Sequence, residues 1–133
     1  APHVEAEVSQ QVAMLREVFG GMPPPDAARL HALGKVHDIQ AGELLVQQGV
    51  VSMDLLVLLG GECLVTKDAV KLSTVGAPHL FGEMSASCNM PNPTKVTTAA
   101  PSKVLSVPKG DVIALVKEFA ACKALGAALL QGA

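Results

Sequence analysis

The segment that decides the fold is Val75-Gly76-Ala77-Pro78-His79-Leu80-Phe81-Gly82-Glu83-Met84. A short run of helix-tolerant residues continues from it to Cys88, and Pro91 begins the next extended segment. Gly82 allows the backbone to approach a ligand closely, and the N–H groups that begin a short helix attract anions. Glu83 at this turn can accept hydrogen bonds from sugar hydroxyls or cap the turn. Because Phe-Gly-Glu alone is a short motif, its meaning depends on the sequence around it.

Short β-strands are predicted on both sides of this segment. Glycines and prolines separate runs rich in Val and Leu, at residues 44–47, 55–59, 63–66, 70–72, 95–99 and 104–107. Strands punctuated by turns in this way are typical of an antiparallel sandwich or barrel, and we expect about seven or eight of them. Residues 55–59 are apolar throughout, which predicts burial on both faces, and Gly60-Gly61 predicts a tight hairpin with positive φ angles.

Two helices are predicted before the strands. Apolar residues recur at helical spacing over residues 3–19, and Gly20-Gly21 with the three prolines after it ends that pattern. Asp26 follows the prolines and is predicted to cap a short helix over residues 27–33, which Gly34 closes.

Helical character returns after the last strand. Asp111 is predicted to cap a helix whose apolar residues form one stripe, and residues 120–130, rich in Ala and Leu, predict a further helix. We therefore read residues 1–133 as one domain with N-terminal helices over 1–34, strands over 35–108 and C-terminal helices over 109–133.

Length and composition limit the class of protein. The 133 residues are 50% hydrophobic and carry a net charge of -2, which predicts one folded domain and excludes wholesale disorder. No apolar run approaches the ~18 residues that a membrane helix needs, so we expect no membrane insertion by this chain. Lys and Arg do not cluster, so nucleic acid is not an expected partner.

The polar residues show no pattern of a metal site or a hydrolytic enzyme. Cys63, Cys88 and Cys122 form no Cys-x-x-Cys pair, and no His lies at zinc-ligand spacing from them. We therefore expect buried thiols in a reducing compartment, either the cytoplasm or a cytoplasm-facing part of a larger protein. Because no His-x-His, Ser-His-Asp or Cys-His motif occurs, neither a metal site nor a catalytic residue is predicted.

These landmarks, in this order, resemble the cyclic-nucleotide-binding domain family from about Leu15 to Leu130. Residues 55–65 are similar to the family's central hairpin. The other motifs that carry the resemblance are the N-terminal helices, Ala41-Gly42-Glu43, Gln48-Gly49, Phe81-Gly82-Glu83-Met84 and the two closing helices. The resemblance implies an α+β, mainly β fold, in which an eight-stranded antiparallel β-roll of the jelly-roll type is flanked by N-terminal and C-terminal helices.

The resemblance also implies a function. Modules of this family bind a 3′,5′-cyclic nucleotide, either cyclic AMP or cyclic GMP, and transmit the binding signal to a neighbouring effector domain or partner protein. We therefore expect a non-enzymatic regulatory module without a cofactor. The segment from Phe81 to Met84 is similar to the start of the family's phosphate-binding cassette, in which Glu83 would hold the ribose 2′-hydroxyl. Backbone amides of the short helix hold the cyclic phosphate in that family, and Ser85 is a candidate donor to it.

The cassette departs from the family after Pro91. The family places an arginine at the next position, where this chain has Asn92, and Pro93 after it has no N–H. The arginines of this chain are Arg16 and Arg29, both in the predicted N-terminal helices. Since truncating one partner of a buried charge pair costs about 2–5 kcal/mol, we expect cyclic nucleotides to bind weakly or atypically.

Three residues near the missing arginine are candidate substitutes. Asn92 can hydrogen-bond a ligand or serve as a turn residue before proline. Thr94 lies an even number of positions from Asn92, so on a regular strand its side chain points to the same face as that of Asn92, but it carries no charge. Lys95 lies an odd number of positions from Asn92, which places its side chain on the opposite face. Lys95 is therefore either a phosphate ligand or a solvated residue.

Two functions stay open for the chain. One is a ligand sensor, and the other is a degenerate, non-binding module that acts as a protein docking or assembly domain.

Overall fold

The computed structural model describes residues 2–82 and 89–118. Within them, helices α1 (Pro2–Val18) and α2 (Pro24–Leu33) precede the strands, and helix α4 (Lys109–Glu118) follows them. The strands are β1 (Lys35–Ile39), β2 (Leu44–Val46), β3 (Asp54–Gly60), β4 (Glu62–Lys67), β5 (Val70–Gly76), β6 (His79–Phe81), β7 (Lys95–Thr98) and β8 (Ser102–Pro108).

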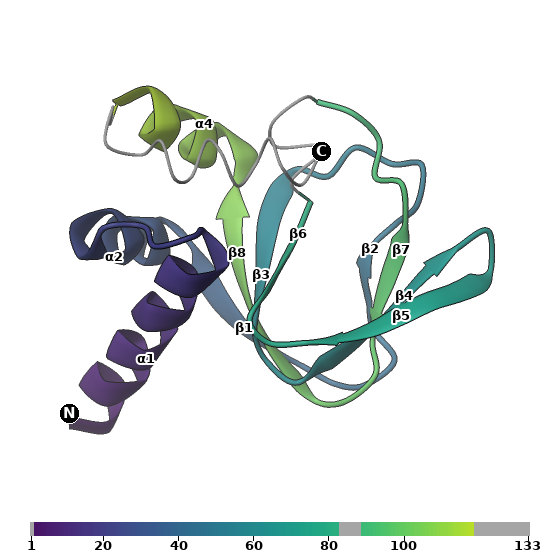
Figure 1. Cartoon of the computed structure of the whole chain (residues 1–133), viewed down its shortest axis with the longest axis horizontal. Helices are drawn as coiled ribbons and strands as arrows, with labels where there is room; N and C mark the ends of the chain where they lie inside the picture. Colours follow the sequence, from purple (N-terminus) through teal and green to yellow (C-terminus); the bar gives the residue numbers. More distant parts are fainter. Residues whose placement is uncertain (1, 83–88, 119–133) are drawn as a thin grey trace.

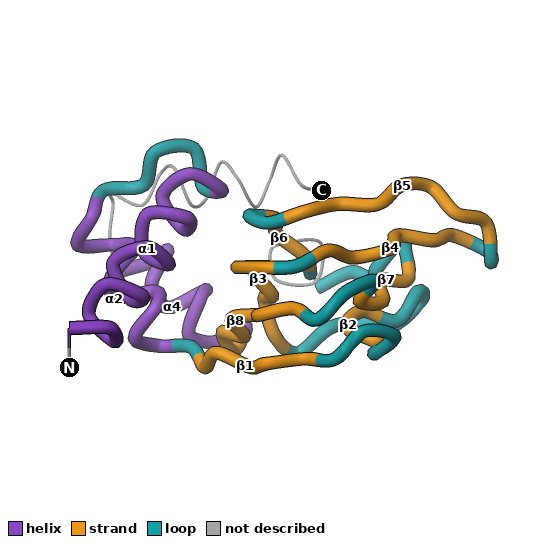
Figure 2. Tube along the Cα trace, turned by 90° about the horizontal axis from the view of Figure 1, so that it is seen from below, coloured by secondary structure: helices purple, strands orange, loops and turns teal. Residues whose placement is uncertain are grey.

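The strands form two antiparallel sheets of four strands each. One sheet has the order β1-β8-β3-β6 and the other has the order β2-β7-β4-β5. Figure 1 shows the two sheets side by side as a roll, with the hairpin of β4 and β5 extending away from the helices. Figure 2 shows the described helices gathered at one end of the roll. The predicted α+β, mainly β fold with eight antiparallel strands is confirmed.

Two clusters of buried apolar side chains stabilise this arrangement, and β3 contributes to both. Successive side chains on a strand point to opposite faces. Leu55, Val57 and Leu59 therefore pack in the cluster that contacts the helices, whereas Leu58 packs inside the roll. The helical cluster also contains Leu15, Phe19, Leu30, Leu105, Val107 and Leu115. The predicted burial of residues 55–59 on both faces is thus confirmed, with one half-buried exception at position 56.

The hairpin predicted at Gly60-Gly61 is wrong. Strand β3 pairs with β6 and β8, while β4 pairs with β5 and β7, so the chain crosses from one sheet to the other between them. Of the two glycines, Gly61 has the positive φ, 94°. A Cβ atom on Gly61 would lie 2.7 Å from the carbonyl oxygen of Pro101, so the crossing also needs the space that glycine leaves.

The two predicted aspartate caps are also wrong. Pro23 precedes α2 without a side-chain cap, the next two prolines take the first helical positions, and Asp26 is buried in the first turn. Proline suits these positions because its φ is already helical and an N–H there would have no helical partner. Helix α4 begins at Lys109, so Asp111 lies within its first turn. Both carboxylates still interact favourably with the positive end of the helix dipole.

Gly34 ends α2 as predicted, but glycine is needed there because the neighbouring atoms leave no room for a side chain. Its φ is -101°, which is not the left-handed conformation of a typical glycine cap. A Cβ atom on Gly34 would lie 2.7 Å from the carbonyl oxygen of Ser106 and 2.8 Å from Cδ1 of Leu105. The end of α2 therefore packs directly against the backbone of β8.

The runs of Val and Leu did not indicate β1 or β6. Strand β1 lies at the edge of its sheet, and its first four side chains are exposed, so its sequence lacks an apolar pattern. Strand β6 has only three residues. The helix predicted over residues 120–130 lies outside the described residues.

Candidate functional site

Four of the predicted site residues come together around one small cavity. Phe81, Gly82, Asn92 and Thr94 line it, and its volume is about 50 Å³. The other lining residues are Val46, Pro93 and Val96. The predicted residues Glu83, Met84 and Ser85 lie outside the part of the chain that the structure describes.

The first wall of the cavity is the end of β6 and the glycine after it. Phe81 is 6% exposed and packs with apolar residues inside the roll. Gly82 has a φ of 83°, and a Cβ atom there would lie 2.9 Å from the carbonyl oxygen of Asp54 at the start of β3. Glycine is therefore required here both by the backbone conformation and by close contact with β3.

Asn92 lies at the position where the resemblance expects arginine, and its hydrogen bonds are made within the protein. The side chain is 4% exposed. Its amide donates to the Val50 carbonyl at 2.8 Å and to the Ser52 hydroxyl at 2.6 Å. Its backbone N–H donates to the same Val50 carbonyl at 2.9 Å, and its own carbonyl accepts from the Gly49 N–H at 2.8 Å. Asn92 thus fastens the loop before β3 to the loop before β7.

Thr94 and Lys95 lie in different environments. Thr94 is half-buried and lines the cavity. Lys95 is exposed, and it is the register partner of Thr66 on β4, whereas Val96 beside it is 1% exposed and packs inside the roll. Lys95 therefore projects from the outer face of the sheet into solvent.

The loop that leads into the cavity is connected to the C-terminal helix. The Lys109 ammonium donates to the Asn89 side-chain oxygen at 2.6 Å. The Lys109 backbone N–H donates to the carbonyl of Met53 at 2.9 Å. Lys109 thus contacts both loops that approach the cavity, one before β3 and one before β7, at the point where α4 begins.

Burial shifts the pKa of two groups near the roll interior, His79 and Cys63, in the direction that disfavours the charged form. The rings of His79 and Phe81 have centroids 4.7 Å apart, and burial lowers the pKa of His79. Burial also raises the pKa of the Cys63 thiol, with the neighbouring Glu62 charge adding to the rise. Among residues 2–82 and 89–118, His, Cys, Asp and Glu form no group of three or more that could hold a metal ion.

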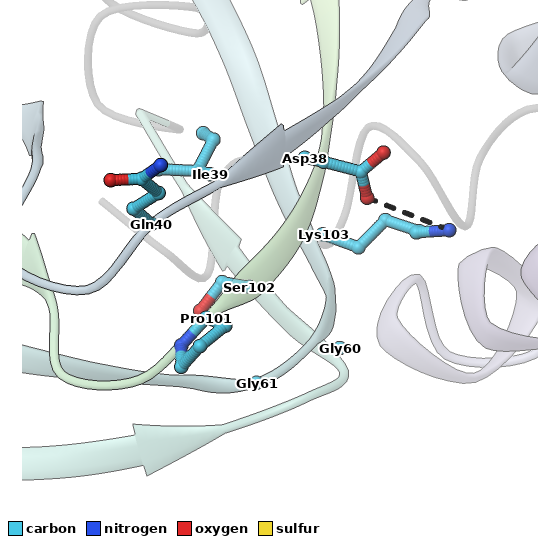
Figure 3. Close-up of a pocket in the computed structure, with 8 residues that line it drawn as sticks. All are labelled: Asp38, Ile39, Gln40, Gly60, Gly61, Pro101, Ser102 and Lys103. Carbon is cyan, nitrogen blue, oxygen red and sulfur yellow. Dashed lines mark ion pairs between the residues drawn. The ribbon is translucent and has the colours of Figure 1, made fainter.

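A larger cavity, of about 490 Å³, lies elsewhere on the roll. Figure 3 shows its lining residues, Asp38, Ile39, Gln40, Gly60, Gly61, Pro101, Ser102 and Lys103. Lys103, which lines the larger cavity, pairs with Gly60, the last residue of β3. Phe81, which lines the small cavity, pairs with Leu56 near the beginning of β3. The two cavities therefore lie toward opposite ends of β3, and the larger one contains none of the predicted site residues.

Sequence reasoning missed the apolar walls of the site and the partners of Asn92. Val46 and Val96 belong to runs that were predicted as strands, and they are 3% and 1% exposed. Val46 on β2 pairs with Val96 on β7, but a register shift between Leu44 and Val46 interrupts the regular pairing of these strands. The alternation of side chains along each strand therefore does not predict that the two valines meet. Val50 and Ser52 carry no motif, and they lie some forty residues before Asn92 in the sequence.

None of the helices in the described part of the chain has the length and the hydrophobicity that a membrane span requires.

Comparisons with known proteins match both the sequence and the fold. The family model described as "Cyclic nucleotide-binding domain" matches residues 36–119. A cyclic nucleotide-binding domain from Methylobacillus flagellatus has a TM-score of 0.79 at 20% identity, over 93% of this chain and 74% of that chain. A comparison with curated proteins finds no match.

Two solved structures of protein kinase A regulatory proteins are also similar. The regulatory domain from Toxoplasma gondii, crystallised with cAMP, has a TM-score of 0.75 at 16% identity, over 91% of this chain and 49% of that chain. The regulatory subunit of a cAMP-independent protein kinase A from Trypanosoma cruzi, bound to guanosine, has a TM-score of 0.76 at 14% identity, over 84% and 41%. The chain thus spans less than half the length of these two structures.

Proposed function

The chain belongs to the cyclic nucleotide-binding domain family, whose members are regulatory modules, and on that premise we propose that it senses a nucleotide or nucleoside weakly or atypically. The module is not an enzyme, it works in the cytoplasm or on a cytoplasm-facing part of a larger protein, and it signals to an attached domain. The observation that carries the proposal is the convergence of Phe81, Gly82, Asn92 and Thr94 on one cavity.

The chemistry of the cavity supports atypical binding. Asn92 replaces the expected arginine, and its side-chain amide donates to Val50 and Ser52. Lys95 projects away from the cavity. The described residues thus offer a cyclic phosphate no cationic partner here, and an unpaired charge is costly to bury.

The contacts of Lys109 support signalling. Lys109 begins α4 and contacts Asn89 and Met53, which belong to the two loops beside the cavity. A ligand that moves either loop therefore changes the contacts at the start of α4, and an attached domain can respond to that change.

The solved relatives support the class of ligand. One similar regulatory domain was crystallised with cAMP and another regulatory subunit with guanosine. Cyclic nucleotides and nucleosides are therefore the first ligands to test on this chain.

Thermal unfolding tests the proposal. The chain has no Trp and no Tyr, so unfolding is followed by calorimetry with millimolar cyclic AMP, cyclic GMP, adenosine or guanosine. A ligand at 100 times its dissociation constant stabilises the fold by about 2.7 kcal/mol, and we expect at least one of the four to raise the melting temperature. Thr94→Phe fills the cavity and should abolish the rise, whereas Thr74→Phe, on the exposed strand β5, should keep it. No rise with any ligand contradicts the proposal.

A docking or assembly module is the second candidate, and one surface favours it. Leu44, Val50 and Met53 are 51%, 51% and 74% exposed. They line a groove of about 320 Å³ that also includes Leu45 and Leu56. Contiguous exposed apolar residues of this kind often mark protein-binding surfaces. The absence of any thermal shift would favour this candidate.

A further inference from the structure

We infer, granted the sensing function proposed above, that the ligand of this site is uncharged, a nucleoside in preference to its 3′,5′-cyclic phosphate. The inference deepens the proposed function, because it names the class of ligand that the neutral side chains of the described lining favour. It depends on the charges and hydrogen-bond donors of the lining residues.

The described lining of the cavity has no ionisable side chain. Its walls are apolar at Val46, Phe81 and Val96, and its polar side chains, Asn92 and Thr94, are neutral. The ring of His79 packs on Phe81, and burial lowers the pKa of this histidine, which disfavours its charged form.

The hydrogen-bond donors at the position of the missing arginine are already in use. Asn92 donates its side-chain amide to Val50 and Ser52, and its backbone N–H also goes to Val50. Pro93 has no N–H to donate. A phosphate placed here would lose its water ligands without gaining donors from these two residues, whereas a neutral sugar or base edge loses far less.

The cations closest in sequence are engaged elsewhere or point away. Lys95 lies on the outer face of the sheet as the partner of Thr66. Lys109 donates to Asn89 and does not line the cavity. Lys103 pairs with Glu7 at 2.6 Å and borders the other cavity. Discrimination against the cyclic phosphate therefore follows from the architecture of the described residues.

Isothermal titration calorimetry on the full chain tests the inference with two matched pairs, adenosine with cyclic AMP and guanosine with cyclic GMP. We expect the nucleoside of at least one pair to bind tenfold or more tightly than its cyclic phosphate, a difference of about 1.4 kcal/mol. Equal affinity, or tighter binding of the cyclic phosphates, would overturn the inference and leave the sensing function intact. No binding by any of the four compounds would overturn both.

A charge-matched pair of variants isolates the cause. Thr94→Lys adds a cation to the cavity lining, and Thr74→Lys adds the same charge on exposed β5. The first should improve binding of the cyclic phosphate relative to the nucleoside by at least tenfold, and the second should leave the ratio unchanged. An unchanged ratio in Thr94→Lys, with its melting temperature retained, would show that a missing cation does not decide the preference.

Discussion

Asn92 lies where the family resemblance leads us to expect arginine, and its side chain forms hydrogen bonds within the protein. Arginine at this position would bring a charge to the ligand, whereas Asn92 is 4% exposed and bonds to the loop before β3. Val50, which supplies the carbonyl, has no motif of its own, so the role of Asn92 in joining two loops could not be inferred from the sequence. At this scale the sequence marks Asn92 as a departure from the family pattern, and only the fold reveals its partners.

Replacing this residue tests its structural role. Asn92→Ala removes two buried side-chain hydrogen bonds, and we expect the free energy of unfolding to fall by about 1–3 kcal/mol. Urea unfolding followed by circular dichroism measures the change. Ser73→Ala, on the exposed strand β5, is the control and should change stability by less than about 0.5 kcal/mol. An Asn92 variant as stable as this control would contradict the role assigned to Asn92.

The N-terminal helices are connected to the roll by a series of polar contacts. His31 Nε2 on α2 lies 2.7 Å from Gln11 Oε1 on α1, and Gln11 donates to Glu7 at 3.4 Å. Glu7 accepts from Lys103 on β8 at 2.6 Å, and Lys103 lies 3.7 Å from Asp38 on β1. Elements far apart in the sequence are thus joined by side chains that no local pattern distinguishes.

The ion pair between Glu7 and Lys103 predicts a dependence of stability on pH. The hydrogen bond and charge of Lys103 lower the pKa of Glu7 in the fold, so its contribution is lost as pH falls through that lowered value. The hydrogen bond to Glu7, with the charges of Asp38 and Glu7, raises the pKa of Lys103, so its contribution is lost as pH rises through that raised value. Stability from this pair is therefore greatest between the two values.

Denaturation at several pH values measures this effect. Glu7→Gln should lose less stability on acidification than the parent chain, and the difference should shrink at high salt because solvent reaches both charged groups. Glu17→Gln, which removes an exposed carboxylate from the same helix, is the control and should follow the parent curve. Identical acid profiles for Glu7→Gln and the parent would mean that the pair contributes nothing measurable to stability.

At the scale of the whole molecule, composition and spacing predicted the class of fold but not the pairing of its strands. The runs at residues 55–59 and 63–66 read as strands because they are mainly apolar and Gly60-Gly61 separates them. That they belong to different sheets follows from β3 pairing with β6 and β8, which depends on contacts distant in sequence. Likewise β1 is held by its pairing with β8 and not by its own propensity.

A heteronuclear NMR titration of the full chain with adenosine or guanosine tests most directly where the ligand binds. We predict that the amide signals of Gly82, Thr94 and Val96, which line the small cavity, shift with ligand concentration. The signals of Gly61 and Lys103, which line the larger cavity, should stay unchanged. Shifts confined to Gly61 and Lys103 would contradict the account.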